Sequence, residues 1–389
     1  MPAKGFAMTT TLERPPARED LSVAAAGVLD VTGRGHGLLR TYAGPGSRPS
    51  PDDVQVTTAQ MRQFGLRAGD FVEGTCARPG SPARVDRVNG RPPEALRGRR
   101  HFRDLTPLHP RERLRLETAG GGAATRLVDL IAPIGKGQRG LIVAPPRTGK
   151  TVLLQQLAAA VAQNHPECHL MVVLLDERPE EVTDMRRSVR GDVLASTFDR
   201  PAKEHIALAD LAVERAKRLV EQGEDVVILL DSLTRLCRAH NNAAASGGRT
   251  LSGGVDAAAV QGPKRLFGAA RLAEEGGSLT ILATALVDTG SRADDYFFEE
   301  LKSTGNMELR LDRALADRRV FPAVDITPSG TRHEELLLGE AELTAVQGLR
   351  RALRSRDGQT TLEALLDRLR HTPDNAAFLR QIHRTVPGA

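Results

Sequence analysis

The sequence predicts an α/β protein in which a small β-barrel precedes a larger domain built on a parallel sheet. Short apolar runs separated by Gly, Pro and Ser turns fill residues 27–88, a spacing typical of a small barrel or sandwich. From about residue 125 onward, continuous apolar runs alternate with helical patterns, which indicates parallel strands covered by helices on both faces. The 389 residues are enough for two such domains.

Composition places the chain among soluble globular proteins. Its 40% hydrophobic and 26% charged residues are ordinary for that class, and its net charge of +5 is modest. No apolar run approaches the roughly 20 residues of a membrane span, so we expect no membrane partner. Three well-separated cysteines, Cys76, Cys168 and Cys237, favour a reduced, cytoplasmic setting over a disulfide framework.

Residues 1–22 lack the apolar stretch of a secretory signal and predict a disordered tail. Residues 23–92 predict the barrel, which has the size of an oligonucleotide-binding barrel (OB-like, cold-shock-like). Its expected elements are strands over 27–31, 36–40, 54–58, 70–76 and 83–88, and a short helix over 58–66.

Residues 93–124 predict an arginine-rich linker. Arginines and prolines crowd 91–116, and TAGGGAA at 118–124 indicates a flexible join. Such a segment is either a solvated linker or a contact for a polyanion, and composition does not decide between them.

Residues 125–389 predict the second domain, with a helical C-terminus over about the last 60 residues. Its expected strands cover 141–145, 171–176, 193–198, 226–231 and 278–286. Its expected helices cover 150–163, 180–189, 209–223, 263–275, 334–353 and 361–370.

The stretch APPRTGKT, 144–151, matches a phosphate-binding loop except at its first position, where Ala144 replaces glycine. It lies between a predicted strand and a predicted helix, where backbone N–H groups converge on phosphates. Lys150 would contact the β and γ oxygens of ATP, and Thr151 would bind Mg²⁺. The alternative, an exposed lysine in the first turn of a helix, is disfavoured because further residues of an ATPase follow in order.

Carboxylates follow two of the predicted strands. Asp231 ends one of them, at the sheet edge where ligands bind, and could hold Mg²⁺ through water; capping of the next helix is the alternative. Asp176 and Glu177 end another strand, where a carboxylate can polarise the attacking water; a solvated acidic turn is the alternative. Arg178 could pair with Glu177 or with the nucleotide.

Two other patterns are discounted. Gly135, Gly137 and Gly140 satisfy Gly-x-Gly-x-x-Gly, but they precede a strand, whereas the dinucleotide motif follows one. The stretch HPECH, 165–169, has no second ligand group at a suitable spacing, so it predicts a helix-to-strand turn in preference to a metal site.

Two polar loops, 241–256 and 288–295, contain Arg249 and Arg292. Each is either an ordinary surface loop or, in a ring ATPase, a loop that contacts a threaded strand. Arg319 and Arg332 are either surface arginines or residues that act across a subunit boundary, where a neighbour's arginine stabilises the transferring phosphoryl group.

Seven longer segments can be compared with known families: GLIVAPPRTGKT, LLDERPEEVTDMRR, ASTFDRPA, ILLDSLTRL, SGGVDAAAVQGPKRLFGAAR, EEGGSLTILATALVDTGS and GNMELRLDR. Together they resemble the bacterial transcription termination factor Rho family, and the resemblance runs from about Gly27 to near the C-terminus. In that family the phosphate loop normally begins Ala-Pro-Pro, so Ala144 is the family's own variant, and alanine is a mild replacement where φ is negative.

The resemblance implies a homohexameric ring with RecA-like motor domains that hydrolyses ATP at subunit interfaces. It implies a 5′–3′ RNA–DNA helicase that draws single-stranded RNA through the ring and releases RNA polymerase, with elongation factors as further candidate partners. The implied catalytic residues are Lys150, Glu177, Asp231, Arg332 as the arginine supplied in trans, and Arg319 near it, with Mg²⁺ held by Thr151 and Asp231.

The resemblance also implies the contact residues. ATP would contact Gly135, Lys136, Gly137, Gln138, Arg139, Gly140, Arg147, Thr148, Gly149, Lys150, Thr151, Val152, Arg178 and Arg235, the last as a sensor of nucleotide state. RNA would contact Gly35, His36, Gly37, Leu38, Leu39, Arg40 and Gln55 in the barrel, and Arg249, Thr250, Leu251, Ser252, Gly253, Gly254, Val255, Asp256 and Arg292 in the channel.

The barrel departs from the family pattern. His36 and Leu38 replace a Gly-Phe-Gly-Phe-like segment whose rings stack on pyrimidines, and Gln55 and Pro82 stand where aromatic residues are usual. Because stacking is worth about 1–3 kcal/mol per base, we expect weaker RNA binding or another base preference. The helical subdomain that precedes the family's barrel is expected here only as a short polar tail.

Two alternatives remain. An RNA-independent ring ATPase of the rotary or protein-export type would share the core but gives no reason for the barrel and the two basic loops. A non-hydrolysing RNA-binding paralogue is disfavoured by the intact set of Lys150, Glu177, Asp231 and Arg332.

Overall fold

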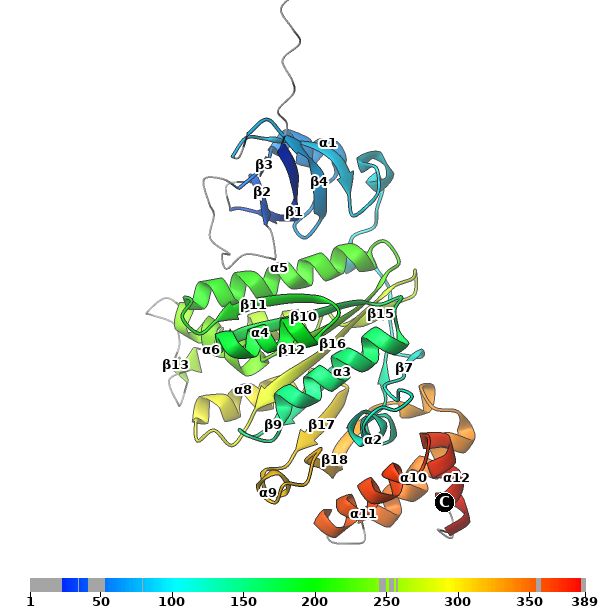
Figure 1. The fold of residues 1–389 in the computed structure, drawn as a ribbon. Helices are drawn as coiled ribbons and strands as arrows, with labels where there is room; N and C mark the ends of the chain where they lie inside the picture. Colours follow the sequence, from blue (N-terminus) through cyan, green and yellow to red (C-terminus); the bar gives the residue numbers. More distant parts are fainter. Residues whose placement is uncertain are drawn as a thin grey trace, which may run out of the picture.

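The computed structural model describes residues 23–33, 35–40, 53–78, 80–244, 250–251, 255–256, 258–354 and 358–385. The predicted tail over 1–22 lies outside the described residues. A small β unit lies at one end of the molecule, a helix-covered sheet in the middle and a group of helices at the other end (Figure 1). The molecule is therefore arranged along its length in the order of the sequence.

The N-terminal unit is a curled antiparallel sheet with strand order β3-β2-β1-β4-β5. Alternate side chains, among them Leu29, Leu39, Val56 and Val72, point into its core, as period-two burial requires. The elements are β1 (Val23–Val31), β2 (Gly37–Arg40), β3 (Gln55–Val56), α1 (Thr58–Phe64), β4 (Phe71–Cys76) and β5 (Ala83–Val88). The expected β architecture and its single short helix are confirmed.

The segment expected to be a linker packs against both domains. Leu96, Phe102, Leu105, Leu114 and Leu116, spaced among the arginines, are all buried, and burial of such side chains is the main favourable term in folding. The segment forms η1 (Pro93–Leu96), η2 (Phe102–Asp104), β6 (Pro107–Leu108) and β7 (Arg113–Leu114). Residues 119–122 are all exposed, so the glycine-rich stretch is a continuous solvated part of the segment, whereas exposed and buried residues alternate before it.

The second domain is built on a mostly parallel sheet, as the sequence predicts, and its strand order is β11-β10-β12-β16-β9-β17-β18. Outside this sheet, β8 pairs with β7 and β13 pairs with β14. The strands of the domain are β8 (Ile134–Gly135), β9 (Arg139–Ala144), β10 (His169–Glu177), β11 (Asp192–Thr197), β12 (Asp225–Asp231), β13 (Thr250–Leu251), β14 (Val255–Asp256), β15 (Arg271–Ala273), β16 (Ser278–Leu286), β17 (Met307–Leu311) and β18 (Val324–Thr331). β18 and β15 run antiparallel to their neighbours.

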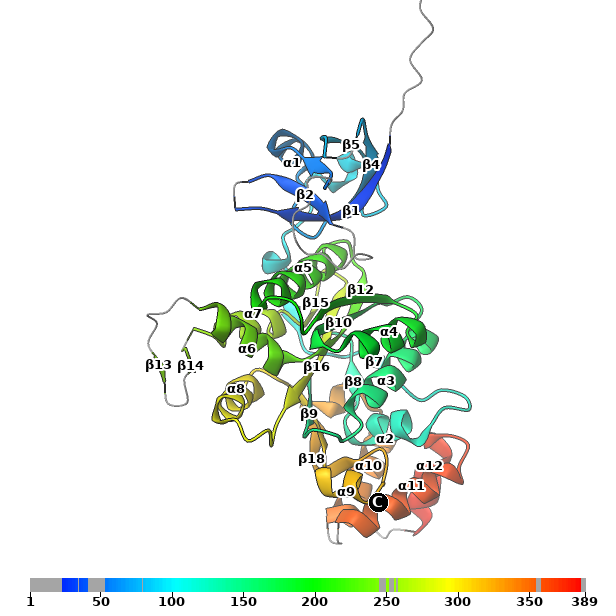
Figure 2. The same ribbon diagram turned by 60° about the vertical axis from the view of Figure 1, so that its left-hand side comes forward.

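Helices cover both faces of this sheet (Figures 1 and 2). Side chains of α2, α3, α4 and the C-terminal helices form one core, and those of α5, α6, α7 and α8 form the other. The helices are α2 (Ala123–Ile131), α3 (Lys150–Asn164), α4 (Pro179–Ser188), α5 (Ala202–Val220), α6 (Leu233–Ala243), α7 (Gln261–Phe267), α8 (Arg292–Lys302), α9 (Arg313–Asp317), η3 (Glu334–Leu336), α10 (Glu340–Arg354), α11 (Gly358–Arg370) and α12 (Asn375–Thr385). Among the described residues, no helix is both long and apolar enough to span a bilayer.

The prediction of one helix over 263–275 is wrong for the second half of that range. α7 ends at Phe267, and residues 271–273 form β15, which pairs with β16. Gly276 and Gly277 have φ values of 109° and 78°, a backbone conformation that glycine adopts without steric cost. They turn the chain back on itself, so a strand pairing replaces the continued helix.

The barrel is joined to the sheet domain by buried ion pairs. Glu221, at the C-terminal end of α5, is fully buried and lies 3.0 Å from Arg67 and 3.3 Å from Arg99. Arg99 also binds Asp70 of the barrel through two hydrogen bonds of 2.6 and 2.9 Å. Gly69 packs so closely that a Cβ there would lie 2.3 Å from the Glu214 carbonyl carbon of α5. The two domains therefore meet through a specific, tightly packed joint.

Candidate active site

The phosphate-binding loop is formed as the sequence predicts. The loop follows β9, and Gly149 lies at the N-cap of α3 with φ of 83°, a conformation that favours glycine. Thr148 is buried, and its hydroxyl donates to the Pro145 carbonyl. Ala144 is buried and is not among the residues with positive φ, which explains why alanine is tolerated there. The N-terminus of α3 is thus open to a phosphate group.

A bulge in β10 directs Glu177 toward this loop. The pairing of β10 with β11 shifts register between Leu175 and Glu177, and Asp176 between them has φ of 58°. Because side chains alternate along a strand, the extra residue places Glu177 on the same sheet face as the loop, and its side chain is buried. Of the two carboxylates expected at this strand end, only Glu177 contacts Lys150.

Two of the predicted catalytic side chains, Glu177 and Asp231, contact Lys150. Its Nζ lies 2.5 Å from Asp231 Oδ1 and 3.4 Å from Glu177 Oε1. Arg235 Nη2 lies 3.2 Å from the same oxygen of Glu177. Burial and then the charge of Asp231 raise the pKa of Glu177 above its ordinary value. A raised pKa suits a carboxylate that takes a proton from water.

Thr284 and Phe321 also lie at the site, although little in the sequence pointed to either of them. The Thr284 hydroxyl donates to Asp231 Oδ1 at 2.8 Å. In the sequence, Thr284 stands out only as a polar residue within the apolar run of a predicted strand. Phe321 is 42% exposed, and Val152 is 57% exposed on the first turn of α3. Both line a cavity of about 430 Å³ next to Gly149, which suits an apolar, flat group such as a nucleobase.

The oxygen atoms around Lys150 suit Mg²⁺. Thr151 Oγ1 lies 3.4 Å from Glu181 Oε2. The Asp231 carboxylate accepts a hydrogen bond from Lys150, the residue that precedes Thr151. Among the described residues, no group of three or more His, Cys, Asp or Glu side chains could hold a metal ion. Proteins usually bind Mg²⁺ through one or two oxygen ligands together with substrate phosphates, and Thr151 and Asp231 are the residues here that could supply them.

The structure separates several predicted ATP contacts from the phosphate loop. Gly135 to Gln138 precede β9, and Arg139 and Gly140 begin it, so that Arg139 lies five residues or ~16 Å from Ala144 at the other end of the strand. Lys136 is buried there, 2.8 Å from Asp225 at the start of β12. Within one chain these residues therefore do not reach the ATP pocket, because they occupy the amino edge of the sheet and the loop occupies the carboxyl edge.

Arg332 and Arg319 lie far from each other. Arg332 directly follows β18 at the amino edge, where its backbone N–H donates to Asn306, and it is exposed. Arg319 precedes β18 and lies beside α9, whose Arg313 donates to Pro146 of the phosphate loop. The eight residues of β18 separate the two arginines, so the expectation that Arg319 lies near Arg332 is not met.

The remaining predicted ATP contacts lie beside the loop. Arg147 is exposed and has φ of 65°. Arg178 is exposed at the N-cap of α4, 3.6 Å from Glu181. Both are therefore on the carboxyl edge of the sheet, where a nucleotide could contact them.

The barrel presents part of its predicted RNA surface. Leu38 pairs with Gln55 across β2 and β3, and Gln55 bridges to Pro82. His36, Gln55 and Pro82 are exposed, and Gly35 has φ of 78° in the adjoining turn. The positions at which the sequence lacks the expected rings therefore form one continuous surface.

Three other predicted barrel contacts have roles within the fold. Leu39 is buried in the barrel core. Gly37 is also buried, and it is packed so closely that a Cβ there would lie 2.5 Å from the Leu29 side chain. Arg40 is buried and lies 2.7 Å from Asp53 and 3.1 Å from Asp30. An arginine held by two carboxylates has less positive charge available for RNA than the sequence suggested.

The predicted channel residues lie on one side of the sheet domain. Thr250, Leu251, Val255 and Asp256 form the β13–β14 pairing, with Val255 buried. Arg292 is exposed at the start of α8. In both ribbon views the hairpin and α8 lie on the same side of the domain, next to α6 (Figures 1 and 2). Arg249, Ser252, Gly253 and Gly254 lie outside the described residues.

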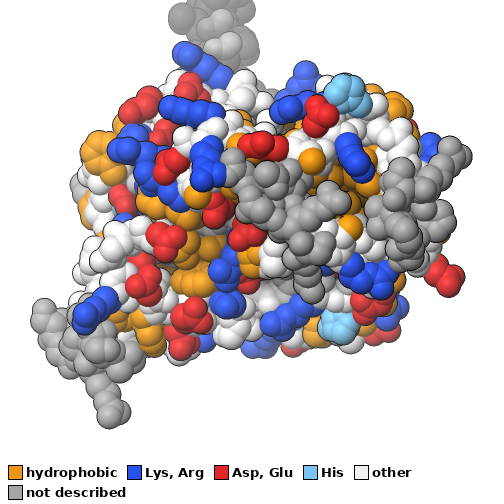
Figure 3. Space-filling view, turned by 90° about the horizontal axis from the view of Figure 1, so that it is seen from below, with side chains coloured by type: hydrophobic (Ala, Val, Ile, Leu, Met, Phe, Trp, Pro, Cys, Tyr) orange, Lys and Arg blue, Asp and Glu red, His pale blue; other side chains and the backbone are white. Residues whose placement is uncertain are grey.

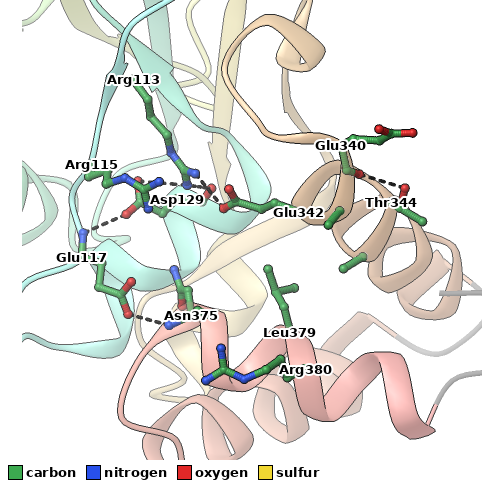
Figure 4. A pocket seen from close by; sticks show the side chains of 13 residues that line it. Arg113, Arg115, Glu117, Asp129, Glu340, Glu342, Thr344, Asn375, Leu379 and Arg380 are labelled. Carbon is green, nitrogen blue, oxygen red and sulfur yellow. Dashed lines mark hydrogen bonds and ion pairs between the residues drawn. The ribbon is translucent and has the colours of Figure 1, made fainter.

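A separate cavity of about 1010 Å³ lies between β7, α2, α10 and α12 (Figure 4). Several of its charged side chains already have partners: Arg113 lies 2.7 Å from Glu342, and Glu117 accepts a hydrogen bond from the Asn375 backbone N–H at 2.6 Å. Asp129 is buried beside them, and burial raises its pKa to about 6. None of the predicted site residues lines this cavity.

The end of the molecule seen from below mixes charges of both signs. Among the side chains that Figure 3 colours, lysines and arginines alternate with acidic residues, and no continuous basic stripe crosses this face.

Comparison with known proteins gives two family matches. Residues 25–94 match the Rho termination factor RNA-binding domain, and residues 124–331 match the nucleotide-binding domain of the ATP synthase alpha/beta family. A transcription termination factor Rho from Streptomyces coelicolor is 70% identical over 380 residues, which are 98% of this chain and 91% of that protein. One from Streptosporangium roseum is 60% identical over 387 residues, 97% of this chain and 99% of that protein.

Among solved structures, a prototypical ATPase from a type III secretion system is similar with a TM-score of 0.57 and 26% identity. The match covers 64% of this chain and 70% of that one. The core is thus shared with an export-type ATPase, but the sequence is far closer to the termination factors.

Proposed function

The chain belongs to the transcription termination factor Rho family, and from this premise we propose that it is an ATP-driven RNA translocase and helicase that acts as a homohexameric ring and releases RNA polymerase. It is an RNA-binding transcription termination factor with an ATPase domain. The RNA-independent export-type alternative is not favoured, because it leaves the RNA-binding domain without a role.

The side chains around Lys150 divide the work of hydrolysis. Lys150 turns from Asp231 toward the β and γ phosphates when ATP binds, since an ammonium group pairs with whichever anion is closest. Glu177 takes the proton of the attacking water, for which its raised pKa suits it. Mg²⁺ bound by Thr151 and water-linked to Asp231 would neutralise phosphate charge. Arg235, 3.2 Å from Glu177, is placed to respond to the loss of the γ-phosphate.

The position of Arg332 supports a site shared between two subunits. Arg332 is exposed at the amino edge of the sheet, and the phosphate loop lies at the carboxyl edge. A guanidinium at that distance cannot stabilise the transferring phosphoryl of its own chain. In a ring with head-to-tail contacts, the amino edge of one subunit can face the carboxyl edge of the next. Each ATP would then be held by one chain and completed by Arg332 of its neighbour.

Chain connectivity offers a route from ATP to RNA. Asp231 is followed directly by α6, which leads to the β13–β14 hairpin. Thr284 lies in β16, which leads to the loop before Arg292. Arg238 of α6 also forms an ion pair with Asp294 of α8. A small movement of Asp231 can thereby displace both candidate RNA-contacting segments together.

The test is the ATP turnover of the full chain with and without poly(C), poly(U) and mixed RNA, in parallel with Lys150→Ala. We expect turnover that depends on RNA and that is lost in the variant. Turnover that is equal with and without RNA would favour the export-type alternative, and no turnover under any condition would favour a non-hydrolysing paralogue. Because DNA-bound RNA is the helicase substrate, release of a labelled RNA from an RNA–DNA duplex tests the translocation step.

A further inference from the structure

Thr284 is a polar residue in the buried interior of the sheet. It lies in β16, between β12 and β9, and its side chain is completely buried. The strand alternates, so Thr284 shares a face with Leu282, which belongs to the core beneath α3. The same face of β12 ends in Asp231. The register of the sheet thus places a hydroxyl beside the carboxylate of the ATP site.

The Thr284 hydroxyl has one proton, and it donates that proton to Asp231 Oδ1 at 2.8 Å. The same oxygen also accepts from Lys150 Nζ at 2.5 Å. Asp231 is itself buried, so its oxygens have little access to bulk water. Thr284 and Lys150 therefore both donate hydrogen bonds to the same buried carboxylate oxygen.

We propose that Thr284 is a positioning residue for ATP hydrolysis: its hydroxyl holds the Asp231 carboxylate in place when Lys150 leaves it for the phosphates. This inference rests on the hydrolysis described under the proposed function. Without the Thr284 hydroxyl, Oδ1 would lose both hydrogen bonds as Lys150 moves, and a buried acceptor without a donor is costly. The carboxylate would then rotate or remain bound to Lys150, and either change opposes catalysis.

A purely packing role can be separated from this one, because the chain provides a matched residue. Thr280 lies on the same face of the same strand and is also fully buried. Its hydroxyl oxygen accepts a hydrogen bond from the Gly137 N–H at 2.9 Å, at the amino edge of the sheet. Thr280→Val therefore removes a buried hydroxyl from β16 without touching Asp231.

The experiment compares Thr284→Val, Thr284→Ser and Thr280→Val with the wild type in RNA-stimulated ATP turnover. We expect Thr284→Val to lower kcat about tenfold, the size of one lost hydrogen bond to a charged group. Thr284→Ser, which keeps the hydroxyl, should stay within about twofold of the wild type, as should Thr280→Val. Wild-type kcat in Thr284→Val, or equal losses in all three variants, would overturn the proposal.

A binding measurement gives a second readout that does not depend on turnover. The Kd of a fluorescent ADP analogue is measured with Mg²⁺ and with EDTA. We expect Thr284→Val to weaken binding only when Mg²⁺ is present, and Thr280→Val to change neither value. If the wild type failed to hydrolyse ATP with any RNA, the proposed function would be wrong. An unchanged Mg²⁺ dependence of the Kd in Thr284→Val would independently overturn the role of Thr284.

Discussion

Replacement of Glu221 by alanine should loosen the joint between the barrel and the motor. The Glu221 carboxylate is fully buried and lies 3.0 Å from Arg67, 3.0 Å from Arg218 and 3.3 Å from Arg99. It also accepts from the Phe102 backbone N–H at 2.8 Å. The alanine variant leaves these arginines with one counter-charge fewer, and breaking a buried ion pair from one side costs about 3–5 kcal/mol.

The assay is urea unfolding followed by circular dichroism, together with limited proteolysis of the native protein. We expect the free energy of unfolding of Glu221→Ala to fall by about 3 kcal/mol or more, and cleavage within residues 97–106 to accelerate. The matched control is Glu224→Ala, three residues further on, whose carboxylate is 40% exposed and lies 3.8 Å from His169. An exposed pair of that kind is worth at most about 1 kcal/mol. Equal stability of the two variants would refute the argument for a buried joint.

Three further predictions concern the site, the C-terminal cavity and the barrel. Glu177→Gln should lower RNA-stimulated kcat by about 10²-fold or more, and the acidic limb of the wild-type pH profile should lie above the ordinary glutamate pKa because the pKa of Glu177 is raised; a limb at or below that value would contradict the assignment. Asp129 has a pKa raised to about 6, so the folded state favours the protonated acid. As the pH rises from 4 to 6.5, the free energy of unfolding of the wild type should therefore fall by up to about 3 kcal/mol relative to that of Asp129→Asn. Thermal denaturation at several pH values measures this difference, and a difference that stays constant with pH would count against the argument. Gln55→Tyr should tighten binding of a pyrimidine oligonucleotide by about 1–3 kcal/mol in fluorescence anisotropy, with the change confined to the exposed barrel surface; no gain would mean that bases do not reach Gln55.

The sequence was sufficient to predict features that depend on local patterns. The strands and helices around the phosphate loop follow from apolar periodicity, and the convergence of Lys150, Glu177 and Asp231 follows because parallel strands end at one edge of a sheet. The split of the expected helix at residues 263–275 was not predictable in this way, since pairing of β15 with β16 overrides the local helical preference of its residues.

Other features depend on contacts between distant residues. The bulge at Asp176 decides which carboxylate faces Lys150, and no periodic pattern predicts it. Thr284 meets Asp231 only because β16 lies beside β12 in the sheet. The arginines of the connecting segment could belong to a solvated linker or to a polyanion contact on composition alone, but Arg99 pairs with Asp70 and Glu221, and Arg100 pairs with Glu275, all of which lie elsewhere in the chain. The family resemblance also implied that Arg319 lies near Arg332, although the eight residues of β18 separate them within one chain.

The claim that each ATP site is completed by Arg332 of an adjacent subunit is tested most directly by ATP turnover per protomer across a dilution series in saturating Mg-ATP and RNA, with the mass of the particles measured on the same samples. We predict that turnover falls together with the loss of rings and is absent from single chains. A single chain that hydrolyses ATP at the full rate would contradict the shared site.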